Sequence, residues 1–325
     1  HQFPDGVSPY KIPGDPSSGL LWGISNDRPV PAGTGDKKIQ AYNFRICLTD
    51  SPENRIPISR PRDYDPSKYE LLVRLFEAQP SMRKINQYFI WSRMPNRKTD
   101  INNRGGFSTD MIGMNYGWPE GTFEQRKKIF DAHVSYTKGL LYFFKTDKRV
   151  PEELREFVSN WGYPKDEYQQ YGNFTPQLYV REARRMIGDY IMTEHNCRGG
   201  KKVADGIGMA AYTMDSHNCQ RIAENGMVKN EGNVEVGGFP PYPVSYRSLT
   251  PKQDECTNLL VPVCLSASHI AYGSIRMEPV FMVLAQSAAM AASMAIDSKV
   301  TVQKIDISKL QQWLQDDPYL ENKSR

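Results

Sequence analysis

The chain has 325 residues, which is enough for one large domain or two ordinary ones and for a sizeable core. Hydrophobic residues make up 39% and charged residues 24%, a balance that is typical of soluble proteins. The formal net charge of +4 gives little support to nucleic-acid binding, so we expect no nucleic-acid partner. Five cysteines, few and odd in number, predict no disulfide framework.

The first residues do not form a signal peptide, because residues 1–6 have the composition of a loop. We therefore expect the sequence to be the later part of a longer protein. Its localisation stays open, since a signal peptide in the preceding part would make it periplasmic or secreted.

The longest uncharged run covers residues 279–296 and is rich in alanine and methionine. It is just long enough to suggest a membrane span, but it contains Gln286, Ser287 and Ser293. We predict a buried helix of a soluble protein and expect no membrane partner.

The first half of the chain predicts a loop, two strands and three helices. Residues 1–38 are rich in Pro, Gly, Asp and Ser, which is typical of an extended loop. Apolar and polar residues alternate over residues 38–49, which predicts a half-buried strand, and residues 84–91 predict a second strand. Helices are expected from the Asp65-Pro66 pair, after Pro119 with an apolar stripe, and from Pro151.

The second half predicts a helix over residues 179–192 and short strand fragments over residues 231–246. The apolar residues 258–264 predict a strand suited to the centre of a parallel sheet. A loop over residues 266–276 and helices beginning near 279 and 308 complete the chain. The loop at 171–173 predicts a domain boundary near residue 172.

The segment from 258 to 296 is the most informative, because it reads as strand, loop and helix. Four alanines of the helix lie at helical spacing and form a small-residue face, namely Ala285, Ala288, Ala289 and Ala292. Free N–H groups and the positive end of the helix dipole would suit an electron-rich partner such as the O2 edge of a flavin. An ordinary strand–loop–helix unit with an alanine-rich packing face explains the same pattern.

Two histidines are candidates for proton transfer. His217 is flanked by Asp215, Ser216 and Asn218, and His269 lies in the loop described above. A lone histidine is more often a structural residue with its hydrogen bonds satisfied inside the protein, and this alternative stays open for both.

Three arginines, Arg181, Arg184 and Arg185, would share one face of the helix predicted over residues 179–192. They could bind a carboxylate or phosphate, or pair with acidic neighbours such as Glu182. Farther upstream, residues 93–103 carry polar side chains that could bind a sugar or simply form a turn.

The pattern His-x-Cys occurs twice, at residues 195–197 and 217–219. Structural zinc sites usually show Cys-x2-4-Cys or His-x3-5-His spacing instead, so we predict no metal site.

Several of these motifs, in this order, resemble FAD-dependent oxidoreductases. The motifs lie at residues 98–103, 179–186, 215–218, 246–251 and 258–292, and the resemblance covers nearly all of the chain. It implies a flavoprotein similar in fold to the glutathione-reductase type, and hence the α/β class. Residues 1–172 would form an α+β substrate-binding or cap region, and residues 173–325 the C-terminal part of a Rossmann-like flavin-binding domain.

The resemblance also implies FAD as the cofactor. The residues expected to border it are Ser266, Ser268, Arg276, Met277 and Glu278. Family members hold the FAD pyrophosphate with an upstream Gly-x-Gly-x-x-Gly turn, which we do not find here. We therefore expect an upstream FAD-binding segment of the same protein as a partner, and weak or absent FAD binding by this chain alone.

The implied reaction is hydride transfer from a small polar substrate, derived from a carbohydrate, to the flavin. His217 or His269 would act as the base. The predicted substrate-binding residues are Arg181, Tyr246, Arg247, Lys98 and Asn102. A polysaccharide lyase and a non-catalytic glycan-binding module remain as alternatives, and a homo-oligomer is left open.

Overall fold

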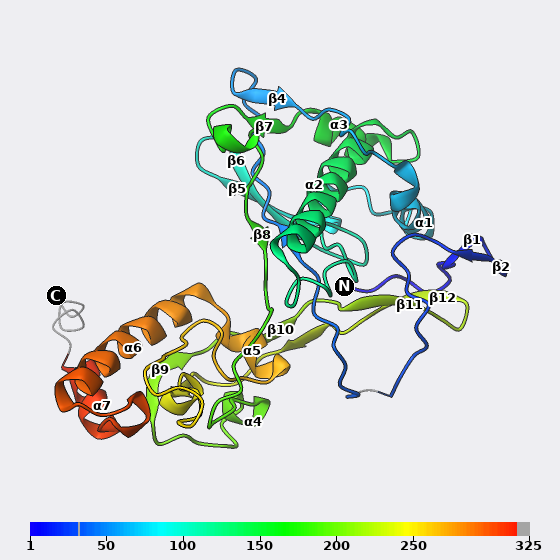
Figure 1. Cartoon of the computed structure of the whole chain (residues 1–325). Helices are drawn as coiled ribbons and strands as arrows, with labels where there is room; N and C mark the ends of the chain where they lie inside the picture. The colour runs from blue at the N-terminus through cyan, green and yellow to red at the C-terminus, as the bar shows by residue number, and fades with distance from the viewer. Residues whose placement is uncertain (32, 317–325) are drawn as a thin grey trace. The chain divides into compact units, whose positions relative to one another are not determined.

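The computed structural model describes residues 1–31 and 33–316. The chain divides into two compact units (Figure 1), and each has its own hydrophobic core. Unit 1 comprises His1–Arg181 and His217–Asn233, and unit 2 comprises Glu182–Ser216 and Val234–Arg325. The mixture of helices and small sheets confirms the predicted α/β class. The predicted assignment of separate roles to residues 1–172 and 173–325 stays a prediction.

The described strands of unit 1 form antiparallel pairs, each a short ladder of its own. The pairs are β1 (Tyr10–Ile12) with β2 (Asp15–Leu20), β3 (Asn43–Phe44) with β8 (Leu178–Tyr179), β4 (Arg55–Pro57) with β7 (Gly162–Pro164), β5 (Phe89–Met94) with β6 (Lys98–Asn103), and β11 (Gln220–Glu224) with β12 (Met227–Glu231).

The segment predicted as a strand over residues 38–49 is regular only at β3. Its alternation is nevertheless correct, because the apolar side chains Tyr42, Phe44, Ile46 and Leu48 are all buried. Isolated bridges from Thr49 reach both strand β6 and strand β7, so this segment joins two of the ladders. The second predicted strand begins later than expected, since a 3-10 turn, η2 (Ile85–Gln87), precedes β5.

The helices of unit 1 begin close to where the sequence predicts them. Asp65 caps η1 (Pro66–Tyr69) by accepting a hydrogen bond from the Ser67 N–H, and α1 (Glu70–Ala78) follows. Thr122 caps the long helix, and its side chain and that of Gln125 form a capping box. This long helix is α2 (Phe123–Thr146), and the remaining helical elements are α3 (Glu152–Ser159) and η3 (Gln169–Tyr171).

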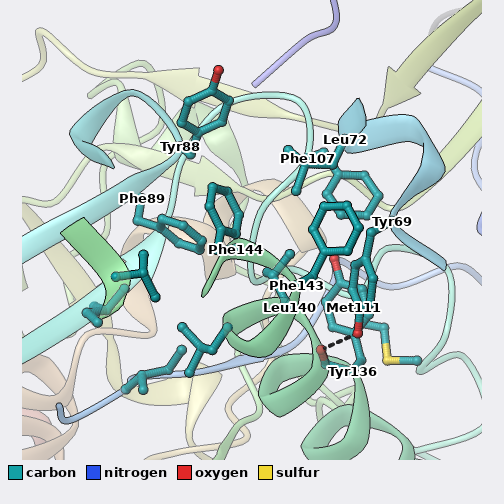
Figure 2. Packing of buried hydrophobic residues seen from close by; sticks show 14 of the residues in the cluster. Tyr69, Leu72, Tyr88, Phe89, Phe107, Met111, Tyr136, Leu140, Phe143 and Phe144 are labelled. Carbon is teal, nitrogen blue, oxygen red and sulfur yellow. Dashed lines mark hydrogen bonds between the residues drawn. The ribbon is translucent and has the colours of Figure 1, made fainter. Parts of the chain in front are cut away.

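Aromatic side chains from η1, α2 and β5 form much of the core of unit 1 (Figure 2). The ring of Phe144 lies 5.0 Å from that of Phe89 in an edge contact, a geometry that aromatic pairs prefer. Tyr69 donates a hydrogen bond of 2.9 Å to the carbonyl of Tyr136. Glycine is required beside it, because a Cβ on Gly139 would lie 2.2 Å from the Tyr69 hydroxyl.

Unit 2 has two described strand pairs, β9 (Gly206–Ala210) with β14 (Tyr242–Ser245) and β10 (Met214–Ser216) with β13 (Val234–Val236). These are the short fragments that the sequence predicts. The helical elements around them are α4 (Glu194–Cys197), η4 (Tyr246–Ser248), α5 (His269–Ile275), α6 (Glu278–Ser298), η5 (Val302–Lys304) and α7 (Ile307–Gln315).

Helix α6 packs closely on strand β9. The Ser287 hydroxyl donates to the carbonyl of Ile207 at 2.7 Å, and a Cβ on Gly208 would lie 2.8 Å from the Val283 side chain. Of the four alanines predicted to form a packing face, only Ala288 is buried. The buried face consists instead of Val280, Leu284, Ser287, Ala288, Ala291, Met294 and Ala295.

By length and composition alone, α6 is long and apolar enough to cross a membrane. Core helices of soluble proteins pass the same test, and 33% of its most apolar window is buried inside the structure. Its buried side chains belong to the core of unit 2. The absence of a membrane partner stays a prediction.

The helix predicted over residues 179–192 does not form. Beyond β8 the chain is irregular until α4. Two of its N–H groups donate to carbonyls of a distant segment rather than to the preceding turn of a helix. The Met186 N–H donates to the Cys264 carbonyl and the Met192 N–H to the Ser266 carbonyl. The three arginines therefore share no helix face, because tertiary contacts outweigh the local helix propensity.

The prediction of a central strand over residues 258–264 is also wrong. These residues form no strand, and Leu259 and Val263 are each 47% exposed. A strand needs a neighbour to pair its backbone, and none of the described strands lies beside this segment. The loop predicted over residues 266–276 contains α5, which the Ser268 hydroxyl caps.

Candidate active site

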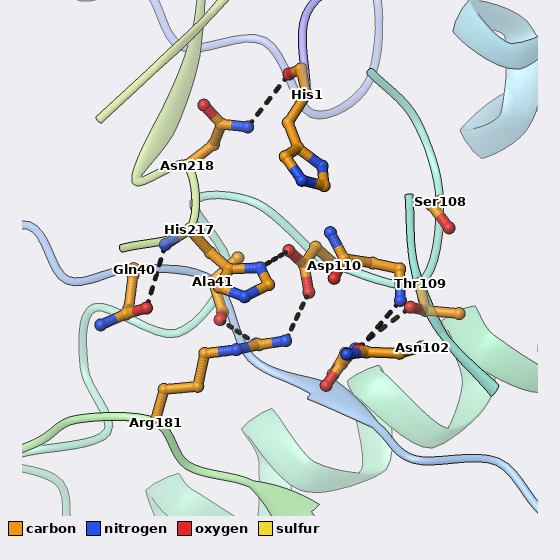
Figure 3. Close-up of polar contacts among 12 residues, drawn as sticks. His1, Gln40, Ala41, Asn102, Ser108, Thr109, Asp110, Arg181, His217 and Asn218 are labelled. Carbon is orange, nitrogen blue, oxygen red and sulfur yellow. Dashed lines mark hydrogen bonds and ion pairs between the residues drawn. The ribbon is translucent and has the colours of Figure 1, made fainter. Parts of the chain in front are cut away.

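A buried cluster of charged side chains lies in unit 1 (Figure 3). The Nδ1 atom of His217 lies 2.7 Å from one carboxylate oxygen of Asp110, and an Arg181 nitrogen lies 3.2 Å from the other. Arg181 also donates a hydrogen bond of 2.6 Å to the carbonyl of Ala41. One carboxylate thus holds a histidine and an arginine from distant parts of the sequence.

The charges of this cluster depend on one another. Asp110 is 6% exposed and Arg181 3%. Burial by itself raises the pKa of Asp110, but the positive charge of Arg181 and the hydrogen bond from His217 outweigh it and lower the pKa. Asp110 therefore stays ionised at neutral pH, and each buried charge has a counter-charge in contact.

The hydrogen bonds of His217 fix the orientation of its ring. Its backbone N–H donates to Gln40 at 3.0 Å, and the ring directs Nδ1 at Asp110. A carboxylate accepts hydrogen bonds, so the neutral ring carries its proton on Nδ1 and its lone pair on Nε2. This is the tautomer in which Nε2 can act as a general base.

A second histidine–carboxylate pair lies within unit 2. His269 places Nδ1 2.8 Å from Glu182, and its Nε2 lies 2.9 Å from the Ser216 hydroxyl. Glu182 and Ser216 are buried. The two predicted histidines therefore each contact a buried carboxylate, and they belong to different units.

Two residues of these clusters escaped the sequence analysis. Asp110 is separated from His217 by 107 positions, and no spacing connects the two. Glu182 was considered only as a partner of the neighbouring arginines, and it is 3.6 Å from Arg185 as well as bonded to His269. An isolated acid in a loop carries no sequence signal of such a partner.

The residues predicted to border the cofactor all lie in unit 2. Ser266 is buried and accepts a hydrogen bond from the Gly188 N–H, while Ser268 caps α5. Arg276 is buried and pairs with Asp215 at 2.9 Å, but its Nε has no hydrogen-bond partner. Met277 occupies the N-cap position of α6 without a side-chain cap, and Glu278 is the first residue of the helix and is exposed. Their role at a cofactor stays a prediction.

The residues predicted to bind substrate contact protein groups. Lys98 pairs with Asp166 and Glu167, and Asn102 accepts a hydrogen bond from Asn43. In unit 2, the Tyr246 hydroxyl donates to the Val302 carbonyl, and Arg247 pairs with Asp205. Arg181 alone among them touches a candidate base cluster, because it holds Asp110. Substrate binding by these residues stays a prediction.

The sequence Gly206-Ile207-Gly208-Met209-Ala210-Ala211 matches a Gly-x-Gly-x-x-Ala fingerprint but has another role. It forms strand β9 rather than a turn that opens a helix. Its glycines allow close packing, since a Cβ on Gly206 would lie 2.7 Å from Pro243. The stretch therefore offers no cradle for a pyrophosphate.

The described residues contain no group of three or more His, Cys, Asp or Glu side chains placed to hold a metal ion. All five cysteines, which are among the described residues, are free thiols. The two His-x-Cys pairs form no ligand set in this part of the chain.

The fold and clusters define an α/β protein in which two histidines each contact a buried carboxylate, an arrangement of the kind that enzymes use for proton transfer. A family described as FAD dependent oxidoreductase matches residues 7–314. The chain belongs to this family, and it is accordingly an FAD-dependent oxidoreductase with FAD as its cofactor. No curated protein and no solved structure matches it.

The described residues fit the ring end of FAD better than its phosphate end. The unpartnered Nε of Arg276 is a buried donor just before the N-terminus of α6, where a positive dipole end suits an electron-rich group. A phosphate cradle would need a glycine-rich turn that opens a helix, and β9 does not provide it. Arg276 and the N-terminus of α6 would therefore suit the ring end of the cofactor.

We predict that Asp110→Asn destabilises the protein by about 3–5 kcal/mol at pH 7, because it leaves the Arg181 charge buried without a counter-charge. The folded-state pKa of Asp110 is lowered. Its stabilising effect is therefore full above the unfolded pKa of about 3.9, and it is lost as the pH falls through the folded pKa. Urea unfolding at pH 7 and in acid measures both effects.

Asp131→Asn is the matched control, because Asp131 forms an exposed ion pair with Lys127. Its effect should stay within about 1 kcal/mol. Equal losses in the two variants, or a gap that does not shrink in acid, would contradict the assignment of Asp110 as a buried, ionised partner.

Proposed function

We propose that the chain's redox reaction removes a hydride from an alcohol or amine carbon of a small polar substrate derived from a carbohydrate, with His217 as the base. The observation that carries this proposal is the contact of His217 with the buried carboxylate of Asp110 in a chain of the FAD-dependent oxidoreductase family. FAD, when bound, supplies the redox chemistry by accepting the hydride. The substrate carbon is oxidised to a carbonyl or imine, and the proton of its O–H or N–H goes to His217 Nε2.

The neighbours of His217 support this role. Asp110 fixes the ring with the lone pair on Nε2, and its negative charge stabilises the imidazolium that forms when Nε2 takes the proton. Arg181 keeps Asp110 ionised by lowering its pKa. Arg181 is thus a positioning residue that acts through Asp110.

Buried acceptors of unit 1 support a hydroxylated substrate. The side-chain oxygens of Asn218 and Asn43 are buried and have no hydrogen-bond partner. Buried polar atoms normally find partners, so these oxygens suit donors brought by a ligand. The hydroxyl groups of a polyol are such donors, whereas a purely apolar substrate has none.

The lyase and glycan-binding alternatives have weaker support. A lyase would need a tyrosine or histidine base next to a group that neutralises a uronate carboxylate. Tyr246 is buried and donates to the Val302 carbonyl, and Arg247 is paired with Asp205, so neither side chain is placed for that task. A glycan-binding module would have no need for an ionised carboxylate oriented at a histidine.

We predict that the full-length protein loaded with FAD loses its flavin absorbance when mixed anaerobically with a polyol or amino-sugar substrate of the correct shape. His217→Gln should slow this bleaching by about 10²–10⁴-fold, the contribution of a positioned base. His195→Gln is the control, because His195 is exposed and should leave the rate unchanged. Absorbance near 450 nm, about the usual flavin band, measures the rate.

Three results would count against this proposal. An unsaturated uronate product without flavin bleaching would favour the lyase. Glycan binding with neither an unsaturated product nor flavin bleaching would favour the glycan-binding module. Bleaching that survives His217→Gln but is slowed by His269→Gln would move the base to unit 2.

We further propose that an upstream segment of the same protein packs on unit 2 and supplies the phosphate cradle. Apolar side chains of unit 2 are unusually exposed, with Met282 at 73%, Ile296 at 75% and Met209 at 54%. An upstream segment packed on these side chains would bury them.

We predict that these 325 residues alone bind FAD more weakly than micromolar, because two phosphate charges find no converging N–H groups in β9. Titration with FAD, followed by the quenching of its fluorescence, measures the affinity. Adding the upstream segment should restore micromolar or tighter binding, about −8 kcal/mol. Micromolar binding by the chain alone would show that the cofactor site is complete within it.

A further inference from the structure

A second imidazole lies beside the proposed base. The rings of His1 and His217 have their centres 6.2 Å apart and are tilted by 39° to each other, and the His1 side chain extends toward His217 (Figure 3). His1 is exposed, and the side chain of His217 is 13% exposed. Both rings contact solvent, so a ligand can reach them, whereas the carboxylate of Asp110 next to His217 is buried.

Two buried amides hold the backbone of His1 in this place. The side chains of Asn218 and Asn230 donate hydrogen bonds of 3.2 Å and 3.0 Å to its carbonyl. Both asparagines are 3% exposed, and Asn218 directly follows His217 in the sequence. A short path of hydrogen bonds from buried side chains therefore fixes the position of His1 relative to His217.

The neighbours of Asn230 hold this anchor in turn. The Gln2 side chain donates to the Asn230 carbonyl and accepts from its N–H, both at 2.7 Å. The Asn230 amide also donates to the Gly106 carbonyl at 2.8 Å and accepts from the buried Arg221 at 2.9 Å. The two bonds that reach His1 end on its backbone carbonyl, so they survive any change of its side chain. A substitution at this position therefore tests the imidazole and not the anchor.

The separation of the two rings suits one small ligand with two polar groups. A hydroxyl that is bound to a ring nitrogen at about 2.9 Å lies roughly 4 Å from the centre of that ring. Two rings with centres 6.2 Å apart can therefore each bind a hydroxyl of the same molecule, with the two oxygens close together. Hydroxyl groups on neighbouring carbon atoms meet this requirement.

We propose that His1 binds the hydroxyl next to the group that His217 deprotonates, so that the enzyme prefers substrates with hydroxyl groups on neighbouring carbons. This inference rests on the proposed role of His217 as the base. An imidazole and a hydroxyl can each donate and accept, so they form a hydrogen bond in either direction. His1 contacts the substrate but does not transfer its proton, so the loss of His1 weakens binding and leaves the limiting rate unchanged.

Glucose and galactose, each with its 2-deoxy analogue, are suitable probes, because the analogue lacks only the hydroxyl beside the oxidisable first carbon. In the full-length protein loaded with FAD, half-maximal anaerobic bleaching should need about fivefold less of the better sugar than of its analogue, the effect of one hydrogen bond. A buried site would reject the analogue far more strongly, but water can replace the lost hydroxyl at the exposed His1 ring.

Three variants test the imidazole. His1→Phe should raise the concentration needed of the sugar to that of its analogue and leave the value for the analogue unchanged. His1→Gln can still form a hydrogen bond, so it should keep part of the preference. His195→Phe is the control, because His195 is exposed and belongs to unit 2.

A preference that is the same in His1→Phe as in the wild type would overturn the inference, as would an equal rise for the sugar and its analogue. Bleaching by neither sugar would also overturn it, because His1 would then select no such pair of hydroxyls. Bleaching by a sugar that is equally fast in His217→Gln would instead contradict the proposed base. The two failures are thus distinguishable, since only the second changes with His217.

Discussion

The buried contact of Asp110 with Arg181 and His217 is the interaction on which the arrangement of unit 1 most depends. Arg181 is the residue at which the chain leaves unit 1, and His217 is the residue at which it returns. A single carboxylate therefore fixes both crossing points from within the unit. Because Asp110 and Arg181 are both buried, the loss of either one leaves the charge of the other without its counter-charge.

The residues next to these crossing points give unit 2 a comparable cluster. Glu182 follows Arg181 and Ser216 precedes His217, and both contact His269. At both places where the chain passes from one unit to the other, the two neighbouring residues thus contribute to different clusters, one in each unit. In an oxidoreductase, such contacts matter because a proton acceptor must be held in place while the cofactor supplies the redox chemistry.

The sequence predicts the elements of the fold that neighbouring residues determine. Its predictions are wrong where contacts with residues far away in the sequence determine the local structure. The Asp65 cap and the stripe along α2 follow from capping and periodicity, and both are confirmed. The helix over residues 179–192 does not form, because its N–H groups bond to residues 264–266 instead. Both candidate histidines could be found from their polar neighbours, but Asp110 could not, since only the folded chain brings it to His217. The family could be recognised from motifs, whereas the substrate depends on a pocket shape that no motif encodes.

His217 can act as the base only if Asp110 holds its ring with the lone pair on Nε2, and the ring nitrogens report this directly. Nitrogen-15 NMR of histidine-labelled protein distinguishes the two neutral tautomers by their chemical shifts and couplings, and His217→Gln assigns the signal. At a pH where the ring is neutral, we expect the proton on Nδ1, and Asp110→Asn should change that population. A neutral ring that carries its proton on Nε2 would contradict the account, because its free nitrogen would then face Asp110 and could not serve as the base.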